Sequence, residues 1–176
     1  MSEICMRLGG SKATLYNYFP SKEALFLEVM FQASEADFRR TMEALNLDGP
    51  DIATTLRHFG ERFLGLLYSP NVASVRRLVV AEGGRSGLGQ RCHAMGPGRG
   101  SMAVSAFLDS AMQRGLLRTA PTALAARQLQ ALLEAELLDR FVFQHLPLPT
   151  PQEIADCTQR AIAAFMQLYA PSAAQP

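Results

Sequence analysis

The sequence has few cysteines and no long apolar run, and both shortages narrow the class of protein. Its three cysteines, Cys5, Cys92 and Cys157, are odd in number and far apart, which favours reduced thiols over a disulfide framework. The longest apolar run is far shorter than the ~20 residues that a membrane-spanning helix needs. No basic segment followed by an apolar one opens the chain. We therefore expect a cytoplasmic protein with no membrane partner.

Motifs for catalysis, nucleotide binding and metal binding are also missing. The glycines of residues 87–89 and 96–101 follow no predicted strand, and no phosphate-loop lysine accompanies them. Cys92 and His93 are adjacent, which is a poor chelating spacing, and the other two histidines stand alone. No serine lies in a nucleophile motif. The sequence therefore predicts no enzyme, no cofactor and no metal site.

Charge is nearly balanced, while apolar residues are plentiful. The chain has 17 basic and 16 acidic residues and a net charge of +1, which by itself does not indicate a nucleic-acid partner. Residues 1–22 hold three basic side chains and one acidic side chain, a weak local positive bias. A hydrophobic content of 48% over 176 residues supports a sizeable core.

Apolar residues recur at α-helical spacing along most of the chain, and no alternating strand pattern appears. We expect helices over about 21–45, 52–67, 72–79, 104–116, 121–144 and 151–169. Thr150 and Glu153 predict a capping box, with Pro151 at the first helical position. Residues 83–100 contain seven glycines and Pro97, which predicts a loop or a broken helix start. The fold class is therefore expected to be all-α.

A helix-turn-helix pattern occupies the amino-terminal residues. Residues 9–25 read GGSKATLYNYFPSKEAL. The two glycines permit a turn, Ser11 can cap the next helix, and Leu15 and Phe19 can anchor that helix one turn apart. The positions left to face outward are Lys12, Thr14, Tyr16 and Asn17.

This segment resembles the helix-turn-helix of tetracycline-repressor-type (TetR family) transcriptional regulators. It fits the family pattern Gly-Val-Ser-Lys-(Gly/Ala/Pro)-Thr-(Leu/Ile/Phe)-Tyr-x-(His/Tyr)-Phe-x-(Ser/Asn)-Lys-(Glu/Asp)-x-Leu. It departs from the pattern at Gly10, where the family usually has Val. The family's first helix has no counterpart here. That absence fits either a misplaced start or a degenerate regulator that no longer binds DNA.

The resemblance implies a partial helix-turn-helix domain over 1–24, an effector-binding and dimerisation domain over 25–170, and a flexible tail over 171–176. The implied function is an effector-responsive transcriptional regulator, expected to be a repressor, that binds a roughly palindromic operator as a dimer. The alternative is a helical dimeric module that binds a ligand or a protein and has lost DNA binding.

By the same resemblance, a recognition helix would enter the major groove of double-stranded DNA. The residues implied in DNA contact are Ser11, Lys12, Ala13, Thr14, Tyr16, Asn17, Tyr18 and Lys22. Ala13 and Asn17 occupy positions where the family often reads base identity.

Two apolar stripes on each of the last predicted helices indicate a homodimer, since a helix wetted on one side needs only one stripe. The predicted interface residues are Leu129, Leu133, Leu137, Ile162, Met166 and Tyr169. The alternative is burial of both stripes within one monomer.

Aromatic and methionine side chains between the predicted helices are candidates for the lining of a pocket for a small, hydrophobic effector. The predicted lining residues are Phe59, Phe63, Leu67, Met95, Met102, Phe107 and Phe141. Each of them could equally be ordinary core. Glu134, Glu136 and Arg140 would either orient a polar group of the effector or form salt bridges at the rim of a dimer.

Overall fold

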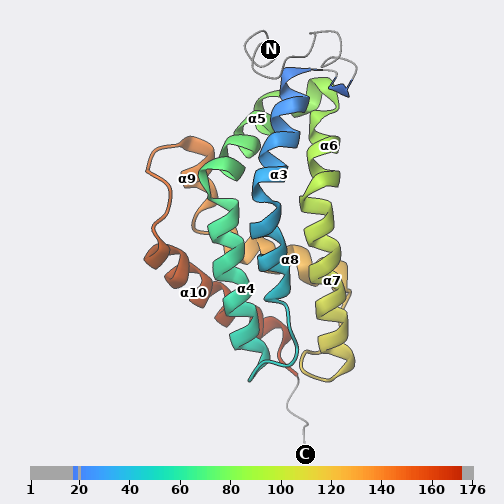
Figure 1. Ribbon diagram of the computed structural model, residues 1–176. Helices are drawn as coiled ribbons and strands as arrows, with labels where there is room; N and C mark the ends of the chain where they lie inside the picture. The colour runs from blue at the N-terminus through green and yellow to red at the C-terminus, as the bar shows by residue number, and fades with distance from the viewer. Residues whose placement is uncertain (1–17, 20, 172–176) are drawn as a thin grey trace, which may run out of the picture.

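Helices make up nearly all of the regular structure of this chain (Figure 1). The computed structural model describes residues 18–19 and 21–171, without the side chains at positions 85 and 86. Within those ranges there is no strand, so the all-α prediction is confirmed. The helices are α3 (Lys22–Glu43), α4 (Ile52–Leu67), α5 (Pro70–Ser86), α6 (Leu88–Met95), α7 (Pro97–Gln113), α8 (Thr122–Glu134), α9 (Leu138–Phe143) and α10 (Pro151–Tyr169).

Side-chain caps fix the starts of several helices. At α3, Ser21 Oγ accepts a hydrogen bond from the backbone N–H of Ala24 at 3.0 Å. At α10, the predicted capping box is confirmed: Thr150 N donates to Glu153 Oε2 at 2.7 Å, and Glu153 N donates to Thr150 Oγ1 at 3.3 Å. Caps of this kind satisfy backbone groups that a helix start otherwise leaves without partners.

Residues 83–100, predicted to form a loop or a broken helix start, are helical with two interruptions: α5 ends at Ser86, α6 spans Leu88–Met95 and α7 begins at Pro97, so the loop alternative is wrong. Gly87 makes the turn between α5 and α6 at φ +67°, a left-handed conformation that suits glycine. Gly96 separates α6 from α7, and a Cβ there would lie 2.5 Å from Phe31 Cε1 on α3. Gly96 therefore lets α3 come close, which composition alone does not distinguish from a loop.

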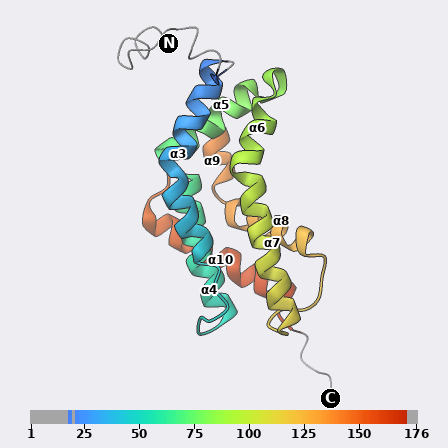
Figure 2. The same cartoon turned by 45° about the vertical axis from the view of Figure 1, so that its right-hand side comes forward.

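Two clusters of buried apolar side chains hold the helices together. The larger cluster joins α4, α7, α8 and α10, and its most completely buried large side chains include Leu56, Phe59, Leu64, Leu108, Leu129, Leu133 and Phe165. The smaller cluster, which joins α3, α5 and α6, consists of Leu27, Val75, Leu88 and Cys92. Figure 2 shows α3 beside the continuous column that α6 and α7 form end to end. No helix in the described ranges combines the length and the apolar character needed to cross a bilayer.

The helix predicted over residues 121–144 is interrupted. α8 ends at Glu134, residues 135–137 form a turn, and α9 starts at Leu138. Gln144 then adopts a left-handed conformation with φ 51°, which directs the chain away from α9 toward α10.

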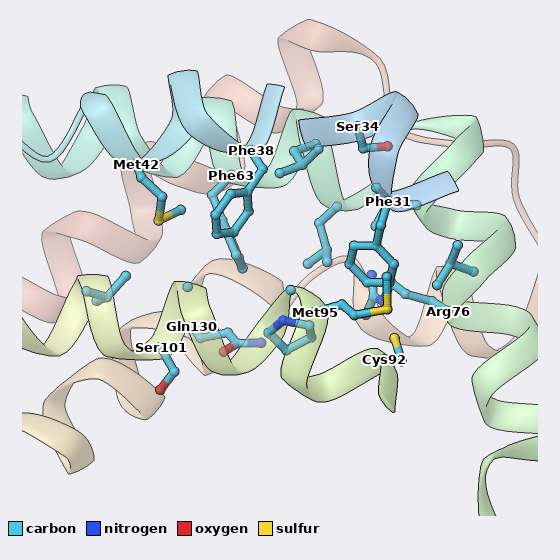
Figure 3. Close-up of a pocket in the computed structure, with 18 of the residues that line it drawn as sticks. Phe31, Ser34, Phe38, Met42, Phe63, Arg76, Cys92, Met95, Ser101 and Gln130 are labelled. Carbon is cyan, nitrogen blue, oxygen red and sulfur yellow. The ribbon is translucent and has the colours of Figure 1, made fainter. Parts of the chain in front are cut away.

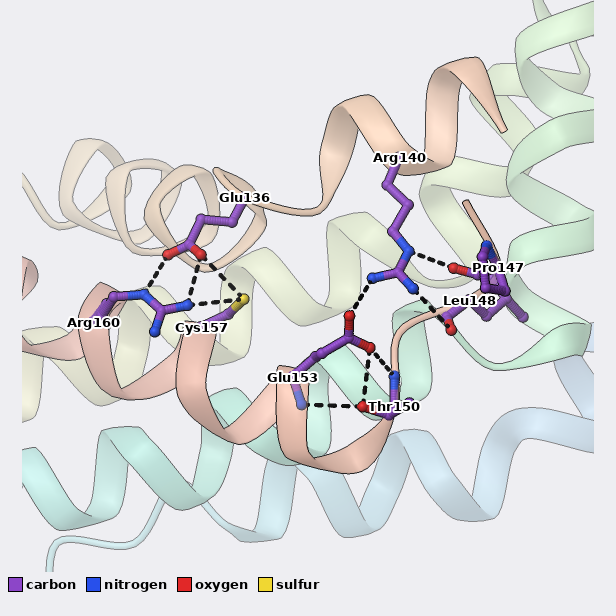
Figure 4. A network of polar contacts seen from close by, with 8 residues as sticks. All are labelled: Glu136, Arg140, Pro147, Leu148, Thr150, Glu153, Cys157 and Arg160. Carbon is purple, nitrogen blue, oxygen red and sulfur yellow. Dashed lines mark hydrogen bonds and ion pairs between the residues drawn. The ribbon is translucent and has the colours of Figure 1, made fainter. Parts of the chain in front are cut away.

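Arg140 connects the segment between α9 and α10 to the start of α10 through hydrogen bonds and an ion pair (Figure 4). Its Nη1 donates to Glu153 Oε1 at 2.9 Å, and its other nitrogens donate to the backbone oxygens of Pro147 and Leu148. Hydrogen bonds from the Thr150 backbone, followed by those from Arg140, lower the pKa of Glu153 to about 2. Arg140 thus serves a structural role within one chain.

Candidate effector cavity and its link to the amino-terminal segment

A cavity of about 220 Å³ lies between α3, α4, α5, the α6–α7 junction and α8. Its walls are mainly apolar, and α3 contributes a long side of it (Figure 3). The α3 residues that line it include Met30, Phe31, Ser34, Phe38 and Met42. Positions 31, 34, 38 and 42 are three or four residues apart, so they share one face of the helix. That spacing marks the inward face of α3, but it does not tell a core face from a cavity wall.

The structure brings four of the seven predicted pocket residues together at this cavity: Phe59, Phe63, Leu67 and Met95. The other three lie elsewhere. Met102 is 69% exposed on the outer side of α7, and Phe107 is buried in the larger core cluster. Phe141 packs edge-on against Tyr68, with ring centroids 6.2 Å apart.

One end of the cavity is polar and holds a buried ion pair. Arg76 on α5 donates from Nη2 to Glu134 Oε1 at 2.7 Å, and both side chains are largely buried. Tyr68 Oη donates to the same carboxylate at 3.3 Å, and Gln130 Nε2 donates to its other oxygen at 3.5 Å. Burial, followed by the charge of Glu134, raises the pKa of Tyr68 to about 12, so Tyr68 stays protonated. Glu134 thus pairs within its own chain.

The guanidinium of Arg76 is held in place by aromatic rings as well as by this carboxylate. Its central carbon lies 4.2 Å from the ring centroid of Phe141 and 5.4 Å from that of Tyr68. Such cation–π contacts fix the plane of the group. Phe141, predicted to line the pocket, therefore contacts a residue of the cavity wall instead.

Beside the cavity, a second ion pair joins α3 to α7. Arg99 donates to both carboxylate oxygens of Glu35, at 2.8 and 3.0 Å, and its guanidinium lies 4.6 Å from the ring centroid of Phe38. The hydrogen bonds from Arg99 lower the pKa of Glu35. Since Glu35 and Phe38 both line the cavity, this contact couples the α3 wall to the α7 wall.

Two of the eight predicted DNA contacts, Tyr18 and Lys22, lie in the described part of the chain. Ser11, Lys12, Ala13, Thr14, Tyr16 and Asn17 lie outside the described residues. Tyr18 is 74% exposed, and Lys22 is exposed in the first turn of α3. These two residues therefore lie just before and at the start of α3, the helix that also forms a wall of the cavity.

The predicted dimer residues pack in the interior of their own chain. Leu129, Leu133, Leu137, Ile162 and Tyr169 are all at most 4% exposed and belong to the larger core cluster, and Met166 packs partly buried against it. A buried side chain has no surface left for a second copy. The apolar side chains that α8, α9, α10 and the 144–150 connection do expose are Leu124, Leu138, Val142, Phe143, Leu146, Leu148 and Leu168.

Cysteine, histidine and carboxylate side chains form no cluster of three or more in the described residues that would hold a metal ion. Cys92 and Cys157 are both buried thiols, and burial raises the pKa of each. Cys92 lines the cavity, whereas Cys157 lies on α10 beside Glu136 and Arg160.

Comparisons with known families identify the class of protein. Residues 54–171 match the C-terminal domain of AefR-like transcriptional repressors, and residues 1–29 match the bacterial regulatory proteins of the tetR family. The first match covers more than half of the chain, so the chain belongs to the TetR family of transcriptional regulators. It is therefore a regulator and not an enzyme.

Solved structures share this fold. A protein from Mesorhizobium loti MAFF303099, described as a TetR-family transcriptional regulator, aligns with a TM-score of 0.81 at 24% identity, over 96% of this chain and 85% of its own. The Flavonoid-responsive Regulator FrrA aligns with a TM-score of 0.77 at 28% identity, over 98% of this chain and 87% of its own. E. coli NemR in its reduced form aligns with a TM-score of 0.60 at 17% identity, over 98% and 88%. A comparison with curated proteins finds no match.

Proposed function

We propose that this regulator binds a roughly palindromic operator as a homodimer in the cytoplasm and that a small apolar molecule in the cavity weakens this binding. The observation that carries the proposal is the position of α3. Its first residues belong to the segment that matches the tetR family, and its middle forms a wall of the cavity. One helix thus connects residues 1–24, proposed to hold DNA, with residues 25–170, proposed to hold the effector and the dimer contact.

The proposed mechanism is a shift between two positions of α3. DNA favours one position and the effector the other, so each ligand lowers the affinity of the protein for the other. An effector in the cavity would contact Phe31, Phe38 and Met42 on the inner face of α3. Movement of that face would strain or break the Glu35–Arg99 ion pair.

The DNA contacts are proposed from the family pattern. Ser11, Lys12, Thr14, Tyr16, Tyr18 and Lys22 would contact the backbone or groove edges, and Ala13 and Asn17 would face the bases. The description of the matched domain as that of a repressor supports repression as the outcome of binding.

The homodimer is proposed through the exposed apolar side chains of α8, α9 and α10 rather than through the buried ones. Leu138, Val142 and Phe143 are 43%, 51% and 70% exposed on α9. Leu168 on α10 and Leu124 on α8 add to the exposed apolar area. An apolar face of this kind is typical of an interface between subunits.

Fluorescence anisotropy with DNA from the intergenic region next to the gene tests DNA binding. We expect specific binding that weakens steeply with salt, because Lys and Arg release counterions from the phosphates. Lys22→Ala should weaken binding to all sequences, whereas Asn17→Ala should change the preference among them. Binding equal to that of random DNA at every salt concentration would contradict the proposal and would favour a helical dimer that binds only a ligand or a protein.

A further inference from the structure

The polar end of the cavity is lined by Arg76 and Glu134, an ion pair with no net charge. Arg76 Nη1 is buried and has no hydrogen-bond partner among residues 18–19 and 21–171. Figure 3 shows the Arg76 side chain reaching from α5 toward the space beside Phe31 and Met95. A buried donor without a partner costs free energy that a suitable acceptor recovers on binding.

The carboxylate of this pair also has capacity left. Glu134 Oε1 already accepts from Arg76 and Tyr68, at 2.7 and 3.3 Å. Among the described residues, Glu134 Oε2 accepts one hydrogen bond, the long 3.5 Å contact from Gln130. A carboxylate oxygen has room for two hydrogen bonds. A ligand oxygen that reaches this end of the cavity would therefore meet one donor and one partly used acceptor.

The net charge at this end decides which ligands fit. The positive charge of Arg76 is balanced by Glu134 at 2.7 Å, and no other basic residue of the described part of the chain lines the cavity. A ligand carboxylate would therefore bring an unbalanced negative charge into an apolar space, which is costly. A neutral oxygen would accept from Nη1 at no such cost.

The rest of the wall fits aromatic rings. Phe31, Phe38 and Phe63 line it, and Met30, Met42 and Met95 provide flexible, polarisable contacts. A dry cavity of about 150 Å³ accommodates benzene, so the cavity of about 220 Å³ in this chain has room for a somewhat larger ring system.

From these observations we infer that the cavity binds an uncharged aromatic molecule with a ketone or phenolic oxygen at one end, which accepts a hydrogen bond from Arg76 Nη1. Aromatic carboxylates of the same shape are rejected because Glu134 already neutralises Arg76. This inference rests on the proposed role of the cavity as an effector site, and it names the chemistry of the effector.

The test uses acetophenone, an aromatic ketone somewhat larger than benzene, and two counterparts of the same skeleton. Benzoate has a carboxylate in place of the acetyl group, and ethylbenzene has a methylene in place of the carbonyl. Calorimetric titration of the full chain should show acetophenone binding at least about tenfold more tightly than benzoate, because benzoate enters the cavity as an unbalanced charge. Acetophenone should exceed ethylbenzene by about threefold to tenfold, the effect of one hydrogen bond.

Variants then test the role of the ion pair. Glu134→Gln frees the charge of Arg76, so benzoate should now bind more tightly than acetophenone. Glu136→Gln is the matched control, because Glu136 pairs with Arg160 outside the cavity (Figure 4) and should leave the order unchanged. In Arg76→Met/Glu134→Met, which removes both charges and the guanidinium donor, acetophenone and ethylbenzene should bind equally. If Glu134→Gln does not fold, this double variant and the wild-type order carry the test.

Four results would overturn the inference. Equal or tighter binding of benzoate to the wild-type chain would do so, as would an unchanged order in Glu134→Gln. If acetophenone binds and releases DNA without either preference, the effector site stands and only its assigned chemistry is wrong. If none of the three compounds binds, both the inference and the effector part of the proposed function fail, while DNA binding is judged separately by anisotropy.

Discussion

The two halves of this molecule are packed differently. Around α4, α8 and α10, large side chains such as Leu56, Leu64 and Phe165 are completely buried. Around α3, α5 and α6, the described residues form a smaller buried cluster of four, and the space beside it is a cavity. The first half, which we call the scaffold half, is therefore densely packed. The second, which we call the cavity half, can rearrange around a ligand at a lower cost in free energy.

The largest contrast should appear on truncation of one phenylalanine in each half. Phe165→Ala should lower the free energy of unfolding by about 3–5 kcal/mol, because it leaves a cavity in a filled core. Phe31→Ala should cost about 1–2 kcal/mol, since that ring already borders empty space and loses fewer contacts. Urea denaturation followed by circular dichroism measures both. Equal losses would show that the cavity half is packed as tightly as the core.

The buried ion pair gives the next largest effect. Glu134→Ala should cost about 3 kcal/mol, because Arg76 keeps its charge in a largely buried site without a partner. The double variant Arg76→Met/Glu134→Met should lie within about 1 kcal/mol of the wild type, since it removes both desolvated charges together. If the double variant is as unstable as Glu134→Ala, then the ion pair itself stabilises the fold, beyond the cost of leaving Arg76 without a partner.

Two glycines of α4 test the packing of the scaffold half. A Cβ at Gly60 would lie 2.7 Å from Thr158 Cγ2 and 2.8 Å from Leu133 Cδ2, whereas a Cβ at Gly65 would meet nothing within 4 Å. Gly60→Ala should therefore lower stability by about 1–3 kcal/mol through overpacking. Gly65→Ala should raise it by up to about 1 kcal/mol through helix propensity. Thermal unfolding compares the pair, and a gain at both positions would mean that α10 can move away from α4.

The smallest effect concerns the ion pair between α3 and α7. Glu35→Gln should lower stability by only about 0.5 kcal/mol at neutral pH, because both side chains are roughly half exposed. Arg99 lowers the pKa of Glu35 below its ordinary value of 4.5, so this stabilisation is present above that pH and disappears as the pH falls through the lower folded-state value.

Glu43→Gln serves as the control for this pair, since Glu43 contacts Arg39 at 3.9 Å within one helix. The difference in unfolding midpoint between wild type and Glu35→Gln should shrink on acidification. A difference that grows as the pH falls would contradict the assigned direction of the pKa.

The sequence predicted the features of this fold that depend on neighbouring residues. The helix over 52–67 and the capping box at Thr150 are encoded within a few positions, and both are confirmed. The loop alternative for residues 83–100 was wrong partly because Gly96 permits the close approach of α3, where a Cβ would lie 2.5 Å from Phe31 Cε1. Such contacts are not visible in a local pattern.

The candidate site was predictable only in part, for a related reason. Residue type marks Phe63 and Phe107 alike as inward-facing, yet the first borders the cavity and the second fills the core. The second apolar stripe of α8 and α10 was assigned to a dimer, whereas Leu129 and Ile162 pack within the larger core cluster of their own chain. The ion pair of Arg76 and Glu134 joins residues 58 positions apart and had no local signal.

Hydrogen–deuterium exchange of the full chain, with and without saturating acetophenone, tests most directly whether the cavity half is the part that responds to a ligand. We predict that acetophenone changes the exchange of backbone amides in α3 and at the α6–α7 junction and leaves α10, which does not line the cavity, nearly unchanged. Exchange that changes as much in α10 as in α3, or that leaves α3 unchanged while acetophenone is bound, would contradict the account.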